Sequence, residues 1–356
     1  MENFDALNTV GIKKETAMDF AIECERTRQF GWKLQGVTVG LSSGTSGHRG
    51  IFLVSDKERA IWAGTILAKT LPRKHLFGHK IAFFMRADSA LYETIHSRLI
   101  DFRFYDLQAS MAENIEKMQA YQPTIIVAPP SALLKIAEFH KGARSPLKVI
   151  SIAEVLEKRD AEKICQRFGI DHVHQIYQCT EGFLAATCEK GVLHLNEEVV
   201  RIDKEWLDDE RFIPIISDLK RRTQPIMNYR LNDILRIRTG GCSCGNPALA
   251  LESIEGRQDD IFIFNGPEGK VEIFPDFIRR CILFSSDVNE YRVVQKNSDF
   301  IVIYADGLSV QTKSQIVREF DNLARQQHFF SPEIVFEPYQ FTGHKKLRRI
   351  ESYVSD

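Results

Sequence analysis

The spacing of hydrophobic residues divides the chain into three regions, and the first alternates between two patterns. From Val37 to about Tyr177, short apolar runs alternate with segments in which apolar residues recur at helical spacing. The runs predict strands at 80–86, 102–107, 124–129, 148–153 and 173–178. The intervening segments predict helices at 55–71, 90–100, 110–121, 131–141 and 159–169, with N-caps at Ser55 or Asp56, Ser110 and Ser131. This order predicts a mostly parallel sheet with helices on both faces.

Strands dominate after Thr180, and the pattern changes again near Arg257. Apolar runs at 183–188, 192–197, 199–203, 212–219 and 234–238 predict a series of antiparallel strands. The last region predicts strands at 260–264, 270–274, 291–295, 300–305 and 333–337, and helices at 276–283 and 313–326. We therefore expect an α/β protein. A large N-terminal domain, residues 1–256, combines the mostly parallel sheet with a β-rich subdomain. A small α+β C-terminal domain spans residues 257–356.

Composition and charge exclude several classes of protein. The apolar share of 44% is ample for a large core. Lys and Arg total 47 against 48 for Asp and Glu, and this balance argues against general binding to nucleic acid or to an anionic membrane. No segment approaches the roughly 20 apolar residues of a membrane-spanning helix, and the N-terminus has no apolar run of signal-peptide length. Seven cysteines, an odd number, indicate a reducing, cytoplasmic compartment.

The stretch VGLSSGTSGHRG, residues 39–50, concentrates hydroxyl groups and glycines between an apolar run and a helix-like segment. Backbone N–H groups and hydroxyls in such a loop suit an anion, above all phosphate, and Arg49 adds a permanent cation. The Walker phosphate-binding pattern and the hydrolase nucleophile elbow are both absent. On these residues alone, an ordinary polar turn is the competing interpretation.

Five motifs, in order along the chain, resemble those of adenylate-forming enzymes. SSGTSGHRG (42–50) resembles the phosphate loop SSGTTG-x-PKG, and IYQCTEG (176–182) resembles the YG-x-TE motif. YRLND (229–233), EGRQDDIF (255–262) and HKKLRRI (344–350) resemble the YRTGD, GR-x-DD and terminal GK-x-x-R motifs. The branch that this chain is most similar to is the phenylacetate-CoA ligase and CapK group, including relatives that adenylylate a deazaflavin coenzyme.

The resemblance implies a role for each matching residue. It implies catalytic roles for Lys346, Glu181 and Arg49: Lys346 reaches the acyl carboxylate and α-phosphate, Glu181 holds Mg²⁺, and Arg49 replaces the usual loop lysine. Lys345 is the competing assignment for Lys346. Asp259 would be the hinge of a mobile C-terminal domain. The residues implied in ATP binding are Ser42, Ser43, Gly44, Thr45, Ser46, Gly47, Ala153, Glu154, Tyr177, Thr180, Asp233 and Arg257.

The implied chemistry has two steps. An aromatic or other hydrophobic carboxylic acid attacks the α-phosphorus of ATP, which gives acyl-AMP and pyrophosphate. The thiol of CoA or of an acyl carrier protein then displaces AMP. One alternative is an adenylyltransferase that leaves AMP on a hydroxyl of a cofactor or polysaccharide precursor. A second alternative is a non-catalytic nucleotide-binding partner of a larger enzyme.

Three departures from the family motifs leave every charged group in place: His48–Arg49 replaces Pro-Lys, and Gln178 and Asn232 each replace a glycine. The segment FNGPEGKVEIFPDF (264–277) differs from the ligases in a region that helps to form their acceptor tunnel, so the acceptor stays open. Only 40 residues precede Leu41. We expect either a reduced N-terminal subdomain, complemented by a partner in a homodimer, or a true start further upstream.

A second cluster of candidate residues is rich in thiols. Cys242 and Cys244 lie in the glycine-rich turn GCSCGN, and Cys188 and His194 flank a short predicted hairpin. Three thiolates and one imidazole form a complete tetrahedral zinc set, and similar positions in the phenylacetate-CoA ligase branch favour structural zinc. The competing interpretation is that the cysteines, buried or exposed, bind no metal and that the histidine is simply hydrogen-bonded.

Overall fold

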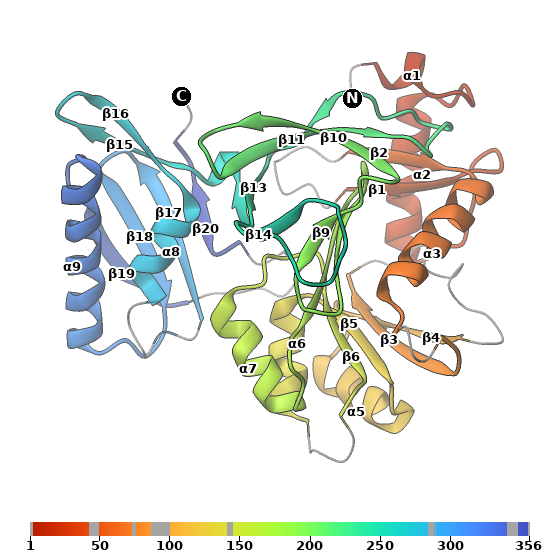
Figure 1. Cartoon of the computed structure of the whole chain (residues 1–356), viewed down its shortest axis with the longest axis horizontal. Helices are drawn as coiled ribbons and strands as arrows, with labels where there is room; N and C mark the ends of the chain where they lie inside the picture. The colour runs from red at the N-terminus through yellow and green to blue at the C-terminus, as the bar shows by residue number, and fades with distance from the viewer. Residues whose placement is uncertain are drawn as a thin grey trace. The chain divides into compact units, whose positions relative to one another are not determined.

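The chain forms two compact units, which are described separately. The first comprises residues 1–205, 215–230 and 237–252, and the second comprises residues 206–214, 231–236 and 253–356 (Figure 1). The structure, a computed structural model, describes residues 3–42, 50–72, 76–86, 100–140, 145–283, 288, 290–339 and 348–354. The predicted helix at 90–100 falls outside these residues except at its last position.

The first unit contains the predicted parallel sheet. Its strands are β3 (His79–Met85), β4 (Ile100–Asp106), β5 (Ile125–Ala128), β6 (Lys148–Ser151) and β7 (His174–Cys179), in the order β4-β3-β5-β6-β7. Each neighbouring pair in this series is parallel. The helices are α3 (Asp56–Thr70), α5 (Met111–Tyr121), α6 (Pro130–Glu138) and α7 (Lys158–Phe168). The predicted alternation of strand and helix is therefore confirmed from β4 to β7, whereas the step between β3 and β4 lies outside the described residues.

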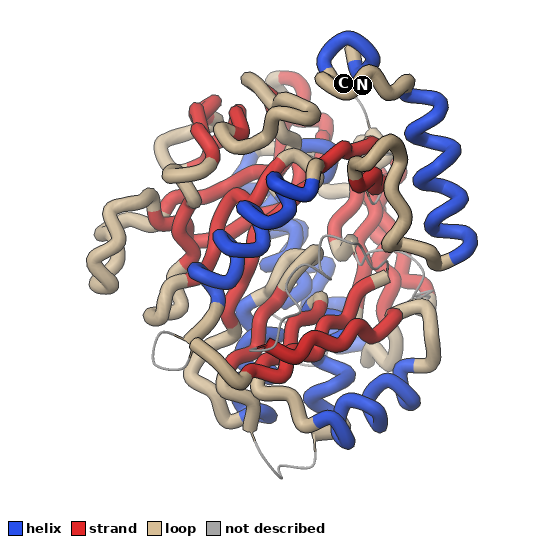
Figure 2. Tube along the Cα trace, turned by 90° about the vertical axis from the view of Figure 1, so that its right-hand side faces the viewer, coloured by secondary structure: helices blue, strands red, loops and turns tan. Residues whose placement is uncertain are grey.

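Helices cover both faces of this sheet (Figure 1, Figure 2). On one face, Phe84 and Val149 pack with Leu133 of α6 and Phe168 of α7. On the other face, strand residues such as Phe83 pack against α3. Burial on both faces explains why the strands have nearly continuous apolar sequences.

Antiparallel strands follow β7 along the chain. β8 (Gly182–Thr187) pairs with β7, β9 (Leu193–Leu195) pairs with β8, and β14 (Ala250–Arg257) pairs with β9. The other strands after Thr180 and before β14 are β10 (Val200–Trp206), β11 (Arg211–Asp218), β12 (Tyr229–Arg230) and β13 (Asp233–Ile237). The predicted series of antiparallel strands is confirmed, although the pattern missed β14 because its sequence mixes charged and small residues.

The N-terminal residues of the first unit pack around a small hydrophobic core of their own. Strands β1 (Thr38–Leu41) and β2 (Ile51–Val54) pair in an antiparallel, two-stranded sheet, against which α1 (Phe4–Leu7) and α2 (Lys14–Thr27) pack. The expectation that a helix directly follows the 39–50 loop is wrong, because β2 intervenes. Its Ile and Val residues favour a strand, and the helix begins only after Ser55.

Serine residues begin two of the predicted helices as expected. Ser55 and Glu58 form a capping box at the start of α3, and the Ser110 hydroxyl accepts from the Glu113 N–H at the start of α5. The N-cap predicted at Ser131 is wrong. Helix α6 begins one residue earlier at Pro130, because proline fits the first helical position, where no N–H partner is needed.

The Glu58 side chain connects α3 to a distant loop of the same unit. Glu58 is 8% exposed, and its carboxylate accepts hydrogen bonds from the N–H groups of Arg222 and Thr223 and from the Thr223 hydroxyl. It also accepts from the N–H and hydroxyl of Ser55. Burial opposes ionisation, but these donors outweigh it and lower the pKa of Glu58 to about 2.

Replacing Glu58 by glutamine is expected to destabilise the folded protein by about 2 kcal/mol at neutral pH, because charge-assisted hydrogen bonds are lost. The folded pKa lies below the unfolded value of 4.5, so the stabilisation is fully present above that pH and is lost as pH falls towards 2. Urea unfolding at several pH values checks this, with Glu113→Gln on an exposed helix position as the control. The contribution of Glu58 would be contradicted if Glu58→Gln and Glu113→Gln lost the same stability on acidification.

The second unit has its own sheet and core. Hairpin β15 (Phe262–Gly266) and β16 (Gly269–Ile273) follows a single 3₁₀ turn, η1 (Gln258–Asp260). A four-stranded sheet has the order β19 (Glu333–Glu337), β18 (Phe300–Ala305), β17 (Tyr291–Asn297) and β20 (Ile350–Ser352). Helices α8 (Pro275–Leu283) and α9 (Val310–Gln327) pack on it through residues such as Ile282 and Phe320. The predicted α+β region is confirmed, and β20, parallel to β17, was not predicted.

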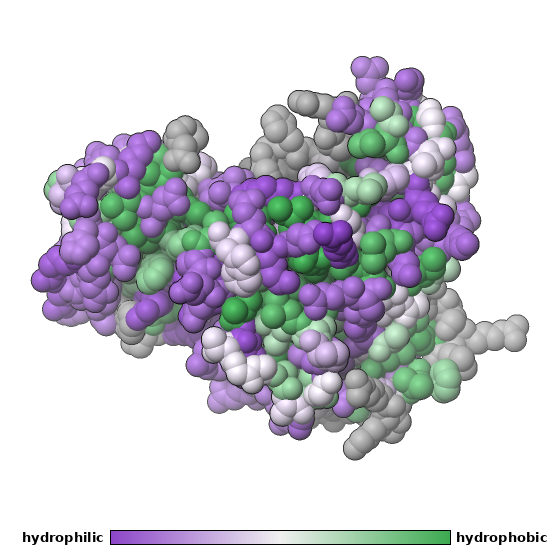
Figure 3. Space-filling view, turned by 45° about the horizontal axis from the view of Figure 1, so that its top comes forward, coloured by the Kyte–Doolittle hydropathy of each residue, from purple (hydrophilic) through white to green (hydrophobic). Residues whose placement is uncertain are grey.

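The surface mixes hydrophilic side chains with smaller apolar areas (Figure 3). Exposed large apolar residues such as Phe77, Met227 and Phe330 are spread along the chain. Within the described residues, every helix is too short or too polar to cross a bilayer.

Candidate functional site

Two predicted site segments follow neighbouring parallel strands of the first unit. Ala153 and Glu154 come directly after β6, and Thr180 and Glu181 come directly after β7. The carboxyl ends of parallel strands share one edge of a sheet, where ligands bind in open α/β folds. The structure thus brings these four predicted residues to one edge.

The backbone after β6 has a conformation that few alanines adopt. Ala153 has φ of 66°, and the Glu154 N–H donates to the Ile152 carbonyl at 2.8 Å. This hydrogen bond across one residue with positive φ is that of a γ-turn, which is rare and strained. Such strain is typical of functional sites.

The Glu154 carboxylate is buried and paired. Arg86, just after β3, donates from Nη2 to Glu154 Oε1 at 3.1 Å, and the Ser131 N–H at the start of α6 donates to Oε2 at 3.3 Å. The Glu154 side chain is 2% exposed and that of Arg86 is 19% exposed. Glu154 therefore joins the ends of three structural elements at the carboxyl edge, and Arg86 is a polar residue there that the sequence reasoning missed.

Glu181 occupies a tight turn. Cys179 of β7 pairs with Gly182 of β8, so Thr180 and Glu181 alone connect the two strands. The Thr180 hydroxyl donates to Glu181 Oε2 at 2.8 Å. The register shifts between Tyr177 and Gln178, and such irregularities are common beside active sites, where they redirect side chains.

Two further residues contact this turn and were missed by the sequence analysis. Arg221 donates from Nη1 to the Thr180 carbonyl and from Nη2 to Gln224 Oε1 at 2.9 Å, and burial lowers the pKa of its guanidinium. Burial raises the pKa of Tyr229, and the nearby Glu181 carboxylate raises it further. Tyr229 belongs to the YRLND motif, which could have indicated it, whereas Arg221 lies in an irregular stretch without a pattern.

The phosphate-loop residues from Ser43 to Arg49 and Lys345 and Lys346 lie outside the described residues. The two ends of the loop are described. The Ser42 N–H donates to the Gly50 carbonyl at 2.8 Å, and the Gly50 N–H donates to the Ser42 hydroxyl at 2.6 Å. Ser42 therefore closes the base of the loop.

The predicted ATP-binding residues Asp233 and Arg257 and the predicted hinge residue Asp259 lie together in the second unit. Arg257 Nε is 3.7 Å from Asp233 Oδ1, and the Gln258 N–H donates to the Asn232 carbonyl at 2.7 Å. Asn232 Nδ2 donates to Asp259 Oδ2 at 2.5 Å, so Asp259 is held within the 3₁₀ turn. The next residue, Asp260, pairs with Arg348, although burial raises the pKa of Asp260.

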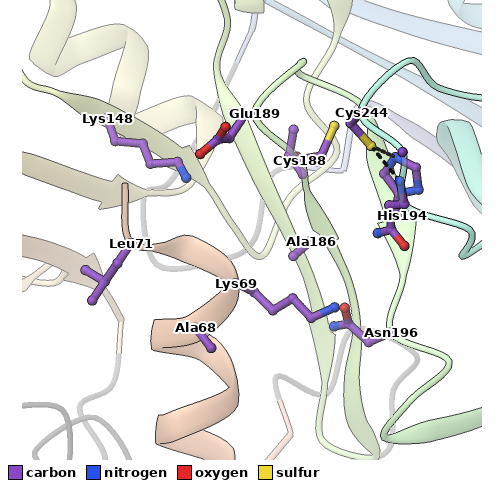
Figure 4. Close-up of a pocket in the computed structure, with 13 residues that line it drawn as sticks. Ala68, Lys69, Leu71, Lys148, Ala186, Cys188, Glu189, His194, Asn196 and Cys244 are labelled. Carbon is purple, nitrogen blue, oxygen red and sulfur yellow. Dashed lines mark hydrogen bonds between the residues drawn. The ribbon is translucent and has the colours of Figure 1, made fainter. Parts of the chain in front are cut away.

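The four predicted metal ligands meet in the first unit. The ligand atoms of Cys188, His194, Cys242 and Cys244 all lie within 4.8 Å of one another. Cys188 Sγ is 3.8 Å from Cys242 Sγ. Cys244 Sγ is 3.4 Å from His194 Nε2, a contact drawn in Figure 4. A tetrahedral zinc site with Zn–S bonds of about 2.3 Å places its sulfurs about 3.8 Å apart. The donor set and its spacing therefore fit a zinc ion.

Hydrogen bonds from neighbouring groups favour the metal-binding forms of these side chains. His194 Nδ1 contacts the Ala248 carbonyl at 2.9 Å, which places the proton on Nδ1 and leaves Nε2 to bind metal. The N–H groups of Lys190 and Asn246 donate to the sulfurs of Cys188 and Cys244, both at 3.4 Å. The Cys244 backbone amide, followed by His194, lowers the pKa of Cys242 to about 6, which favours the thiolate that metals bind.

The fold is similar to that of several acyl-CoA and aryl-CoA ligases. The 2-hydroxyisobutyryl-CoA ligase in complex with 2-HIB-AMP has a TM-score of 0.66 and 14% identity, over 91% of this chain and 74% of the ligase. ATP-bound MatB from Rhodopseudomonas palustris has a TM-score of 0.62 and 13% identity, over 88% of this chain and 65% of MatB. The anthranilate CoA ligase AuaEII with anthranoyl-AMP has a TM-score of 0.59 and 12% identity, over 87% of this chain and 66% of the ligase.

No protein-family model matches the sequence, and no curated protein matches it. The structural neighbours are ligases of the adenylate-forming superfamily, and this chain has their fold, as the sequence motifs predicted.

Proposed function

We propose that this protein is an ATP-dependent, adenylate-forming ligase that activates a carboxylic acid as acyl-AMP and releases pyrophosphate. The observation that carries the proposal is the fold, which is shared over most of the chain with ligases solved with acyl-AMP or ATP. The position of Glu181 and Glu154 at the carboxyl edge of the sheet supports it. The more specific assignment to the phenylacetate-CoA ligase and CapK branch rests on the sequence motifs.

In this proposal, the charged residues divide the work of binding and neutralisation. Glu181, with Thr180 and Arg221 beside it, holds Mg²⁺ against the phosphates, because carboxylate oxygens are preferred Mg²⁺ ligands. Arg49 supplies a cation for the phosphates. Asp233 accepts from the ribose hydroxyls, and Arg257 is its partner. Lys346 neutralises charge that develops on the acid and the α-phosphate.

Tyr177 and the backbone of Ala153 are proposed to contact the adenosine moiety, since Ala153 lies at the carboxyl edge and Tyr177 lies near the carboxyl end of β7. The acid is aromatic or otherwise hydrophobic, and the thiol of CoA or of a carrier protein is the proposed acceptor. Between the two steps, the C-terminal domain, residues 257–356, would rotate about Asp259. This rotation would move Lys346 out of the site and make room for the acceptor thiol.

We also propose that the Cys/His cluster holds a structural zinc ion. All four positions of a tetrahedral site are provided by protein side chains, which is the arrangement of closed structural sites. The ion would join the hairpin after β8 to the 242–246 turn. In this proposal, all four side chains of the cluster stabilise the fold and take no part in the chemical reaction.

The test is acid-dependent ATP–pyrophosphate exchange across a panel of aromatic and aliphatic acids, with and without CoA. Lys346→Ala is expected to lower exchange roughly a hundredfold, because a preorganised cation at the developing charge is lost. Lys345→Ala is the matched control and is expected to retain activity. The opposite result would transfer the role to Lys345. A stable AMP-linked product that forms without a thiol would instead favour the adenylyltransferase.

A further inference from the structure

We propose that a cavity beside the Cys/His cluster is a second ligand site, which binds a phosphate-bearing small molecule through Lys69 and Lys148. This cavity, the lysine pocket, has a volume of ≈ 450 Å³. Its polar lining includes Lys69, Lys148, Glu189, Asn196, His194 and Cys244 (Figure 4). Its size is in the range of pockets that hold small organic ligands.

The lysine pocket is remote from the carboxyl edge of the sheet. Lys148 is the first residue of β6, whereas Glu154 follows the other end of the same strand. The remaining walls come from the last turn of α3, from the end of β8 and from the 244–246 turn. A ligand here would therefore bind at the amino ends of the strands, outside the site proposed for adenylation.

Two ammonium groups enter the lysine pocket from different elements. Lys148, 7% exposed, donates from Nζ to the Thr70 carbonyl at 2.7 Å and extends into the cavity (Figure 4). Lys69 extends from α3 towards Asn196, and its Nζ pairs with Glu198. Each ammonium has three N–H donors, so both lysines can bind a ligand in addition to these contacts.

The charge of the buried Lys148 is only partly compensated by its neighbours. Burial lowers the pKa of Lys148 to about 8, and the neighbouring His174, whose pKa burial lowers to about 3, is a neutral ring at physiological pH. Glu189 is the one carboxylate among the described lining residues, and it lies on an exposed turn with its carboxylate directed towards Lys148 (Figure 4). An anion between the lysines would stabilise their ammonium forms, in competition with Glu189 and with Glu198, which pairs with Lys69.

The chemistry of the donors suits phosphate. Lysine acts as a point charge with rotatable donors, and it is a common phosphate-binding residue. Inorganic phosphate, pyrophosphate and a nucleoside monophosphate share this group. The experiment therefore compares all three.

The first test measures pyrophosphate, phosphate and AMP binding by titration calorimetry with the zinc-loaded protein and four variants. Lys148→Met and Lys69→Met are each expected to weaken binding roughly tenfold, because one cation is removed. Glu189→Gln is expected to tighten binding, because the competing carboxylate is removed. Lys117→Met, at an exposed position of α5 that pairs with Glu113, is the matched control and is expected to have no effect.

The second test locates the ligand on the wild-type protein. Lysine amines are methylated with formaldehyde and a mild reductant, and each site is quantified by mass spectrometry of peptides. The bound phosphate compound is expected to slow methylation of Lys148 several-fold and to leave Lys117 unaffected. An unchanged Lys148 rate at saturating concentrations of all three compounds would overturn the proposal. So would wild-type affinity in folded Lys148→Met or Lys69→Met. Because AMP and pyrophosphate can also bind at the proposed adenylation site, protection of Lys148 is the result that assigns binding to this cavity, and it does not depend on acid activation.

Discussion

Replacing Glu181 by glutamine is expected to lower acid-dependent ATP–pyrophosphate exchange by roughly a hundredfold or more, because the proposed Mg²⁺ ligand loses its charge. Glutamine has the same size, and its amide oxygen can still accept from the Thr180 hydroxyl, whose bond to Glu181 is 2.8 Å long. The two-residue turn between β7 and β8 should therefore survive. The measurement is the exchange rate at saturating ATP over a series of Mg²⁺ concentrations, in which the variant should need more Mg²⁺.

Glu138→Gln, at an exposed position at the end of α6, is the matched control, and its exchange rate should equal that of the wild type. Thermal unfolding of both variants separates catalysis from folding. If Glu181→Gln is folded and exchanges within roughly threefold of the wild type, less than 1 kcal/mol of barrier, Glu181 does not hold the metal.

Removal of the proposed zinc ion is expected to destabilise the protein by about 4 kcal/mol. This is the stabilisation that binding supplies when the free zinc concentration is about a thousand times the dissociation constant. The cluster joins Cys188 and His194 to a turn roughly 50 residues later, so its loss frees two loops at once. For a domain of this size the melting temperature should fall by roughly 10 °C. The measurement is thermal unfolding with and without a chelator, with the zinc content determined on the same samples.

Cys244→Ser is expected to reproduce the effect of the chelator, because serine is a poor zinc ligand. Cys165→Ser removes a half-buried thiol outside the cluster, and it should retain both zinc and sensitivity to the chelator. Protein that contains no zinc as purified, and whose melting temperature the chelator leaves unchanged, would contradict the zinc proposal.

The fold was predictable where hydrophobic periodicity and capping agree. The parallel strands are buried on both faces and alternate with helices, so β3, β5 and β6 were found. Short strands such as β2 and β20 have too few residues for a periodic signal, and β20 forms only because it pairs with β17. The start of α6 was predicted wrongly, because Pro130 and not Ser131 sets the start of the helix.

Site residues were predictable when their chemical type was distinctive. Three cysteines and a histidine are rare enough to be grouped from sequence, and the structure brings all four together. Arg221 and Arg86 were missed, because an arginine among many gives no signal until the fold places it beside Thr180 or Glu154. The same holds for Lys148, which becomes unusual only through burial.

Strand β8 has a consequence for how this protein can tolerate insertions and deletions. It begins directly after Glu181 and ends directly before Cys188, so six residues in fixed register separate the two. Because side chains alternate along a strand, one extra residue in the turn would reverse the facing of every residue in β8. The length of this hairpin is therefore constrained from both ends, and homologous chains should vary here by substitution and not by length.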